Sequence, residues 1–221
     1  MIPAVHRPFG SHAALTGLRA ALVLTASLLL AACSGTGGTT PAPTTAATAE
    51  AAACPGSQPD ALPAGESRTV TIETDKGAIA ITIEADLSPI AAGNFVALAG
   101  CGYYDGVVFH RVVPGFVIQG GDPTGTGTGG PGYEIQDEAV TATYSRGTVA
   151  MARTSQPNSV GSQFFIVLDD AARSSLASAN TYQIIGTVSS GMDTVDAIAV
   201  AADAELPSSP VVMTKVTVIN P

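Results

Sequence analysis

Short stretches in which apolar and polar residues alternate dominate the chain beyond its first third. The two clearest, 68–74 and 78–84, flank Asp75-Lys76-Gly77, a combination typical of a β-hairpin. Further strands are expected, in chain order, at 107–112, 116–120, 148–152, 163–168, 182–188 and 211–219. Many short strands predict a mainly β protein, either an antiparallel barrel or a sandwich, and periodicity alone does not choose between the two.

Two segments carry the signals of α-helices. Ser88 followed by Pro89 is typical of an N-cap and a first helical residue, and apolar residues recur at helical spacing up to Gly100. A second helix is expected to open at Gly191-Met192 and to reach about Val200. The pattern therefore predicts two helices inserted between the strands.

The N-terminal segment 1–32 has the features of an export signal. Arg7 and Arg19 supply positive charge, and the apolar run 20–30 is too short for the roughly 20 residues of a membrane span. The run ends in Leu30-Ala31-Ala32-Cys33, which resembles a bacterial lipoprotein processing site. The resemblance implies cleavage before Cys33, acylation of that cysteine and an extracytoplasmic, membrane-anchored protein. An ordinary cleavage site with an incidental cysteine, or an uncleaved short anchor, is the alternative.

Residues 33–66 are expected to form a tether ahead of a folded domain at 67–221. Gly, Thr, Ala, Pro and Ser dominate this segment, which therefore buries too little apolar surface to offset its ordering entropy. Cys54 lies in the tether and Cys101 in the domain, and outside the cytoplasm they can form a disulfide. Two unpaired thiols are the alternative.

Charge and residue content exclude several classes of function. The 221 residues carry a formal net charge of −9, with 9 basic and 18 acidic side chains, so a nucleic-acid partner is not expected. The cysteines lack zinc-binding spacing, no histidine pair lies at i, i+4, and the folded domain contains only His110. No serine has the flanking glycines of a nucleophile elbow. We expect no metal and no cofactor, and nothing in the sequence indicates an assembly larger than a monomer.

The most informative stretch is Phe109-His-Arg-Val-Val-Pro-Gly-Phe-Val-Ile-Gln-Gly-Gly-Asp122. Arg111, Phe116 and Gln119 place a permanent cation, an aromatic ring and an amide within nine residues, and none of them is an acid, a base or a nucleophile. Ser162-Gln-Phe-Phe-Ile166 adds a second amide and a second ring. Together the two segments resemble the cyclophilin family of peptidyl-prolyl cis/trans isomerases, and the likeness extends from about Thr69 to Asn220. The resemblance implies a closed eight-stranded antiparallel β-barrel capped by two α-helices.

Arg111 is the candidate catalytic group for such a reaction. The rotation barrier of an X–Pro bond is near 20 kcal/mol because the nitrogen lone pair is delocalised into the carbonyl. In the twisted state the lone pair is localised, so a donor aimed at the nitrogen binds that state better than either planar isomer. Arginine stays protonated and presents a rigid fork of donors. The alternative is a structural arginine paired with a carboxylate.

The resemblance also assigns the groups that hold the substrate. Phe116 and Phe165 match the rings that line the proline slot, with Val117 beside them, and Gln119 and Gln163 match amides that hold the substrate backbone. The alternatives are ordinary core aromatics and a structural amide network, because a buried glutamine must find hydrogen-bond partners.

Five further residues are assigned to substrate binding by the same resemblance. They match a substrate-binding edge, a glycine-rich loop beside a secondary pocket and an apolar rim, and they are Ala152, Arg153, Gly127, Leu176 and Tyr182. Arg153 stands where many family members carry asparagine. The chain contains no tryptophan, which cyclosporin-binding relatives usually place near the rim, so weak cyclosporin inhibition is expected.

The sequence thus predicts an exported isomerase acting on X–Pro bonds of unfolded or newly translocated proteins. Two other functions use the same barrel. One is a module that binds proline-containing peptides without turnover, and the other is a structural barrel without a groove. Retention of Arg111 favours the enzyme, because a peptide binder has no need of a donor at the prolyl nitrogen.

Overall fold

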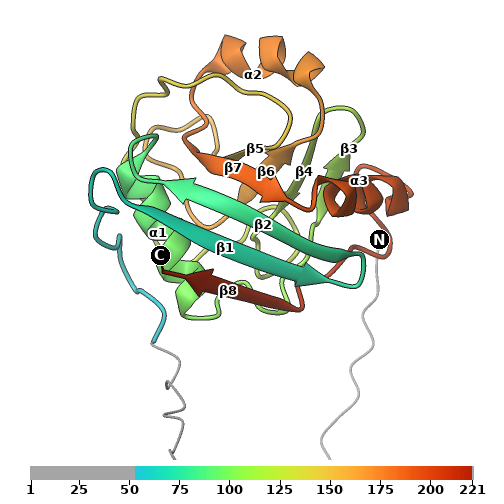
Figure 1. Ribbon diagram of the computed structural model, residues 1–221, viewed down its shortest axis with the longest axis horizontal. Helices are drawn as coiled ribbons and strands as arrows, with labels where there is room; N and C mark the ends of the chain where they lie inside the picture. Colours follow the sequence, from blue (N-terminus) through green and yellow to red (C-terminus); the bar gives the residue numbers. More distant parts are fainter. Residues whose placement is uncertain (1–52, 221) are drawn as a thin grey trace, which may run out of the picture. The chain divides into compact units, whose positions relative to one another are not determined.

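A computed structural model describes residues 53–220, which form a mainly β domain around one antiparallel sheet (Figure 1). The strand order is β3-β4-β6-β5-β7-β2-β1-β8. The strands are β1 (Ser67–Thr74), β2 (Gly77–Glu84), β3 (Arg111–Val113), β4 (Val117–Gly120), β5 (Thr148–Met151), β6 (Phe164–Val167), β7 (Ile184–Ser190) and β8 (Lys215–Ile219). The expected mainly β, antiparallel architecture is confirmed.

The expectation of a closed barrel is wrong, because the sheet curls into an open half-barrel. β3 and β8 are its two ends, and no ladder joins them. The segments that lead into them meet at an isolated bridge between Val108 and Val212. The N–H of Val112 in β3 donates to the carbonyl of Glu205 in an irregular segment, at 2.8 Å. This segment occupies the edge where a closing strand would pair.

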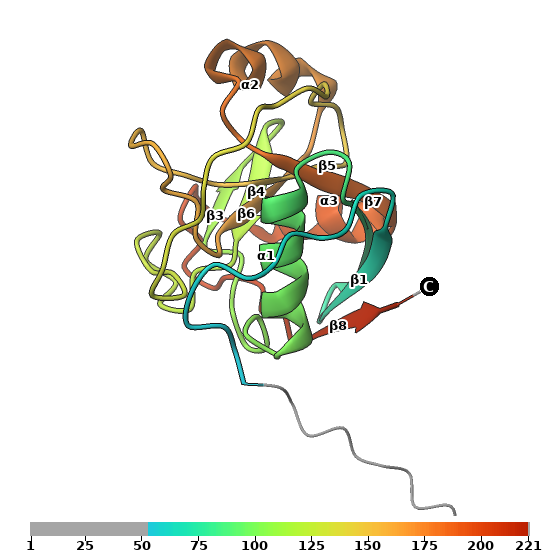
Figure 2. The same cartoon turned by 90° about the vertical axis from the view of Figure 1, so that its left-hand side faces the viewer.

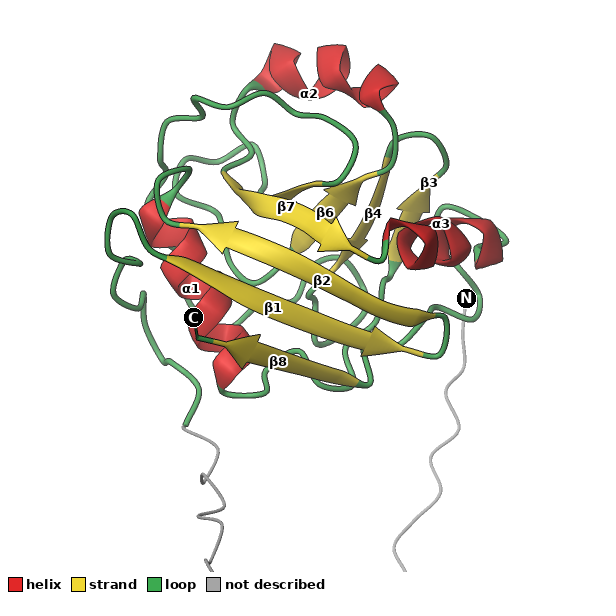
Figure 3. Ribbon diagram, viewed as in Figure 1, coloured by secondary structure: helices red, strands yellow, loops and turns green. Residues whose placement is uncertain are grey.

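The described part of the chain contains three α-helices rather than the two expected (Figure 3). They are α1 (Pro89–Gly100), α2 (Arg173–Ala179) and α3 (Met192–Ala201), and a 3₁₀ turn at Asp170–Ala172 leads into α2. The helices α1 and α3 agree with the sequence pattern. Helix α2 has seven residues, mostly Ser and Ala, and buries only Leu176. So short and polar a helix has no apolar periodicity by which to predict it.

The core lies between α1 and the concave face of the sheet. Seen from the side, α1 runs between the two arms of the curled sheet (Figure 2). Phe95 of α1 packs edge-on against Phe164 of β6, with ring centroids 5.1 Å apart, and lies 5.3 Å from the ring of Tyr104. These rings are fully buried. Aromatic pairs in this geometry contribute about 0.5–1.5 kcal/mol beyond the area they bury.

A distant carboxylate, rather than Ser88, caps the start of α1. The side chain of Ser88 makes no capping hydrogen bond. Instead Glu138 accepts hydrogen bonds from the backbone N–H groups of Ile90 and Ala91, each at 2.9 Å. A carboxylate here satisfies two orphan donors and also interacts favourably with the positive end of the helix dipole.

The described part of the expected tether, residues 53–66, packs against α1. Leu62 is buried, and its N–H donates to the carbonyl of Pro89 at 2.9 Å. Gly93 permits this close approach, because a Cβ there would lie 2.3 Å from the carbonyl oxygen of Asp60. A disulfide joins Cys54 to Cys101 just beyond α1. Ordered structure therefore begins before residue 67.

The expected export signal, the lipidation site at Cys33 and most of the tether lie outside the described residues. Within residues 53–220, no helix is both long enough and apolar enough to cross a membrane.

Loss of the disulfide should destabilise the domain, because the bridge closes a loop with a sequence separation of 47. On the chain-entropy account, Cys54→Ser with Cys101→Ser should lower the free energy of unfolding by about 4 kcal/mol. Urea denaturation of the double variant and of wild type measures the difference. Reduced wild-type protein should match the variant, and equal midpoints for oxidised wild type and variant would contradict the prediction.

Candidate active site

Strand register places the candidate residues in one row across the sheet. Arg111 of β3 lies opposite Gln119 of β4, and Gln119 lies opposite Phe165 of β6. Residues directly opposite one another in antiparallel strands project from the same face, with Cβ atoms about 4.5–5.5 Å apart. The cation, the amide and the ring therefore share one face without any contribution from loops.

This row borders an apolar cavity of about 160 Å³ between the sheet and α2. Its lining includes nine of the residues predicted for catalysis or substrate binding, namely Arg111, Phe116, Val117, Gln119, Ala152, Arg153, Phe165, Leu176 and Tyr182. The ring of Tyr182 packs edge-on against that of Phe165, with centroids 5.4 Å apart. The mixture of aromatic and aliphatic walls with arginine and amide side chains suits a small apolar ring attached to a polar backbone.

Arg111 is held at both ends of its guanidinium. Its Nε lies 2.7 Å from Oε1 of Glu205, and its Nη1 donates a long 3.4 Å hydrogen bond to Oε1 of Gln119. The carboxylate partner of the structural alternative is thus present. The pair uses the Nε side, however, and Arg111 still lines the cavity. Of its five N–H donors, three remain without a partner among the described residues.

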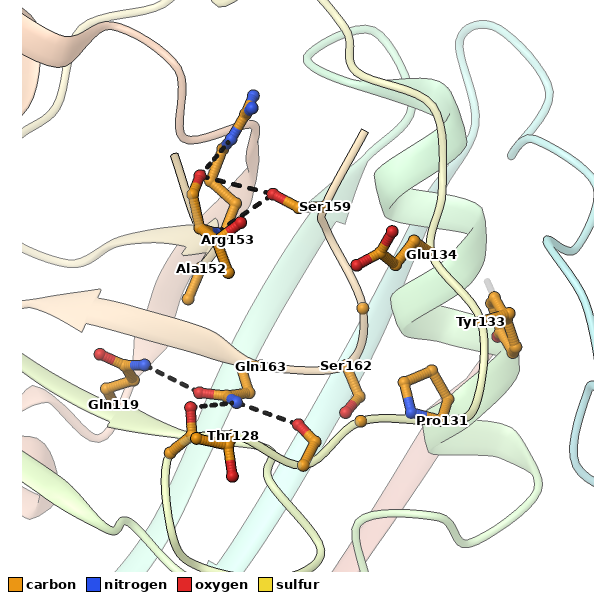
Figure 4. A pocket seen from close by; sticks show the side chains of 15 residues that line it. Gln119, Thr128, Pro131, Tyr133, Glu134, Ala152, Arg153, Ser159, Ser162 and Gln163 are labelled. Atoms are coloured by element: carbon orange, nitrogen blue, oxygen red, sulfur yellow. Dashed lines mark hydrogen bonds between the residues drawn. The ribbon is translucent and has the colours of Figure 1, made fainter. Parts of the chain in front are cut away.

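The two candidate glutamines form a chain of oriented amides. Gln119 Nε2 donates to Gln163 Oε1 at 2.9 Å, and Gln163 Nε2 donates to the carbonyls of Gly127 and Gly129, each at 3.0 Å (Figure 4). The orientation of each amide is fixed by the next, so the oxygen of Gln119 is presented to Arg111. The structural amide network that was the alternative interpretation of these glutamines is therefore present. It ends at Arg111, the candidate catalytic residue.

Asp122 fixes the glycine loop on which this chain rests. Its buried carboxylate accepts hydrogen bonds from the N–H groups of Thr124, Gly127 and Gly129 and from the hydroxyl of Thr124, at 2.6–3.0 Å. Burial by itself would raise the pKa of Asp122. The hydrogen bonds outweigh burial and lower the pKa from 3.8 to about 2, because they stabilise the ionised form.

A second cavity, of about 310 Å³, adjoins the first (Figure 4). It shares Gln119, Ala152 and Arg153 with the apolar cavity and continues past Gly127 and Gln163 towards Pro131, Tyr133 and Glu134. The predicted Gly127 and Gln163 belong to this cavity rather than to the apolar one. The two cavities are therefore continuous with one another along these shared residues.

The charge of Arg153 is used within its own loop. Its guanidinium forms an ion pair with Asp137 at 2.9 Å and donates to the carbonyls of Thr154 and Gln156. The side chain is only 9% exposed. Arg153 therefore shapes the wall of both cavities but presents little free charge to a ligand.

Two supporting residues were missed at the sequence level. Glu205 lies 94 positions from Arg111, and nothing local marks it as a partner. Tyr144 is buried and donates its hydroxyl hydrogen to the carbonyl of Tyr182 at 2.8 Å, which holds the cavity wall. Burial raises the pKa of Tyr144 to about 12, so the donor stays protonated.

His110 is buried, burial lowers its pKa, and its ring nitrogens have no hydrogen-bond partner among the described residues. Within residues 53–220, no group of His, Cys, Asp or Glu could hold a metal ion.

Comparison with known proteins identifies the family. Residues 69–218, well over half of the chain, match the model for cyclophilin type peptidyl-prolyl cis-trans isomerases. A peptidyl-prolyl cis-trans isomerase of Synechococcus elongatus is 50% identical over 95 residues, which cover 43% of this chain and 65% of that protein. A Brucella abortus protein named "Probable peptidyl-prolyl cis-trans isomerase" is 38% identical over 154 residues, covering 64% of this chain and 76% of the other.

Solved structures agree with the sequence matches. A crystal structure of a Cryptosporidium parvum cyclophilin type peptidyl-prolyl cis-trans isomerase superimposes with a TM-score of 0.63 at 31% identity, covering 70% of this chain and 99% of that one. The chain therefore belongs to the cyclophilin family of peptidyl-prolyl cis-trans isomerases. It spans less than two thirds of the length of several curated relatives that it matches.

Removal of the charge on Asp122 should weaken the fold in a pH-dependent way. The folded-state pKa lies below that of the unfolded chain, so ionised Asp122 stabilises the fold above about pH 4, and this contribution is lost as the pH falls to about 2. Asp122→Asn should cost about 2 kcal/mol at pH 7 and much less at pH 2.

Urea denaturation at the two pH values measures this difference. Asp60→Asn, at an exposed carboxylate outside both cavities, is the matched control and should behave as wild type. An equal loss for Asp122→Asn at pH 7 and pH 2 would show that the carboxylate charge is not the cause.

Proposed function

We propose that this protein is an exported, lipid-anchored peptidyl-prolyl cis-trans isomerase that accelerates rotation of X–Pro bonds in unfolded or newly translocated polypeptides. Uncatalysed isomerisation takes tens of seconds and limits the folding of many chains. No cofactor takes part, because the reaction makes and breaks no bond of the substrate other than the partial double bond of the amide.

The main observation behind this proposal is that Arg111 lines an apolar cavity together with Phe116 and Phe165. The cavity holds the proline ring while the preceding carbonyl rotates. A free N–H of the guanidinium donates to the prolyl nitrogen, which has a localised lone pair only in the twisted amide. Because this hydrogen bond is stronger in the transition state than in either planar isomer, it lowers the barrier.

The amides of Gln119 and Gln163 support the same reaction in a different way. Their chain rests on the glycine loop that Asp122 holds, so Gln119 is already oriented towards Arg111 before substrate binds. Preorganised groups need no rearrangement at the moment of reaction, and their stabilisation is therefore retained in the transition state. A Cryptosporidium parvum relative, 32% identical to this chain, was crystallised in the presence of the dipeptide Ala-Pro, which supports a proline-containing ligand.

The competing proposal is a peptide-binding module that uses the same cavities without turnover. Such a module needs the apolar slot and the peptide-sized groove, but it gains nothing from a free donor beside the prolyl nitrogen. Among residues 53–220, three N–H groups of Arg111 have no partner, and this favours the enzyme.

Export and lipidation rest on the leader and on the disulfide. Arg7 and Arg19 precede an apolar run that ends at Cys33 in a sequence similar to lipoprotein processing sites. The disulfide between Cys54 and Cys101 is consistent with an oxidising compartment outside the cytoplasm. More than one acyl chain on the mature N-terminus would anchor the protein stably, because each buried methylene contributes about 0.8 kcal/mol.

Replacement of Arg111 should separate catalysis from binding. Arg111→Ala should reduce kcat/KM by about 100-fold or more in a protease-coupled isomerisation assay, with peptide affinity reduced only slightly. Arg146→Ala is the matched control, because Arg146 also forms a 2.7 Å carboxylate pair, with Asp196, but lines neither cavity. Wild-type protein that binds peptide without accelerating isomerisation would establish the module instead.

Mass spectrometry of the mature protein tests the export proposal. The expected species starts at Cys33 and carries acyl chains, and Cys33→Ala should release the protein from the membrane fraction. A mature form that keeps residues 1–32, or one that starts elsewhere without lipid, would contradict lipidation.

A further inference from the structure

One acidic residue contacts β3 through both its backbone and its side chain. The carbonyl of Glu205 accepts the N–H of Val112 at 2.8 Å, and its carboxylate lies 2.7 Å from Nε of Arg111. Two adjacent residues of β3 are therefore bound to one residue of the irregular segment between α3 and β8. The backbone hydrogen bond fixes the position of Glu205 beside the strand. The carboxylate is therefore already within reach of Arg111.

The segment that carries Glu205 is stabilised by a contact of its own. The carboxylate of Asp203 accepts hydrogen bonds from the N–H of Ser208, at 2.9 Å, and from its hydroxyl. This closes a short loop with Glu205 inside it. Pro207 and Pro210 further restrict the backbone, since proline fixes φ. Glu205 is thus presented by a preorganised loop.

The position of the carboxylate suits orientation of the guanidinium rather than contact with substrate. Arg111 lines the apolar cavity, whereas Glu205 does not line either cavity. Glu205 holds Nε and Gln119 holds Nη1, and two attachments on a planar group fix both its position and the direction of its plane. The three remaining N–H groups are all on the η nitrogens and keep their capacity to donate.

Exposure argues against a mainly structural role for this ion pair. The side chains of Arg111 and Glu205 are 34% and 60% exposed, and ion pairs this open to water add little to stability. A bound peptide that covers the cavity removes water from this region, so the attraction strengthens when the reaction takes place. The consequence of the pair should therefore appear in kcat rather than in the melting temperature.

We infer that Glu205 is a positioning residue for peptidyl-prolyl isomerisation, which acts by holding Nε of Arg111 so that the η nitrogens face the prolyl nitrogen in the apolar cavity. This inference rests on the catalytic role proposed for Arg111.

The test combines substitutions at Glu205 with Arg111→Ala. Glu205→Ala should lower kcat/KM about tenfold, because a misdirected donor loses much of its effect, and the loss should lie in kcat with KM nearly unchanged. Glu205→Gln keeps an oxygen that accepts from Nε, so it should recover most of the activity. Glu84→Gln, at an exposed glutamate on β2, removes the same charge on a strand that β5 and β7 separate from β6, and should leave activity unchanged.

Two further measurements show whether Glu205 acts through Arg111. In the Arg111→Ala background, Glu205→Ala should cause no additional loss, because the residue that it positions is absent. The Nε–H resonance of Arg111 should exchange with solvent faster in Glu205→Ala than in wild type. Urea midpoints of the single variants should stay close to that of wild type.

The outcomes distinguish this inference from the proposed function. Full activity of Glu205→Ala, with Arg111→Ala inactive, would overturn the positioning role and leave the catalytic role of Arg111 standing. Full activity of Arg111→Ala would overturn both. An equal loss from Glu205→Ala with and without Arg111, or a loss explained by a lowered urea midpoint, would show that Glu205 acts on the fold instead.

Discussion

The register of three short strands is the constraint on which the site depends. Arg111, Gln119 and Phe165 face the same side only because β3, β4 and β6 pair with these residues directly opposite one another. Side chains alternate between the two faces of a sheet, so a slip of one residue in any of these ladders would send part of the row to the opposite face. β3 contains three residues and β4 four, so few ladder hydrogen bonds are available to fix the register. Contacts outside the ladder therefore have to support it.

Those contacts are polar and come from both ends of the row. At one end Asp122 holds the glycine loop, the loop carbonyls hold Gln163, and Gln163 holds Gln119. At the other end Glu205 binds β3 through its backbone and Arg111 through its side chain. A carboxylate thus terminates the network on each side. These links favour a single arrangement of the two glutamines, because leaving a half-buried amide unpaired is costly.

The parts of the fold that depend on local pattern could be predicted from the sequence. The hairpin β1–β2 and the helices α1 and α3 lie close to their expected limits, because alternation, turn residues and helical spacing are all local signals. The residues around the proline slot were predicted from the resemblance to a family. In the structure, nine of the predicted residues line one cavity. Helix α2 and the open edge between β3 and β8 were not predicted. A seven-residue polar helix has no periodicity, and the closure of a sheet depends on which segment reaches its edge.

By itself the sequence determined which groups two short segments supply: a permanent cation, two amides and two rings. Only the tertiary structure decided what each charge is used for. It pairs Arg153 with Asp137 and so removes that charge from the ligand surface, and it brings Glu205 to Arg111 across 94 positions of the chain. It also assigns the capping of α1 to Glu138 instead of Ser88. The physical reason is the same in each case, because an ion pair or a helix cap depends on distance in space, and contacts between distant segments leave no local pattern in the sequence.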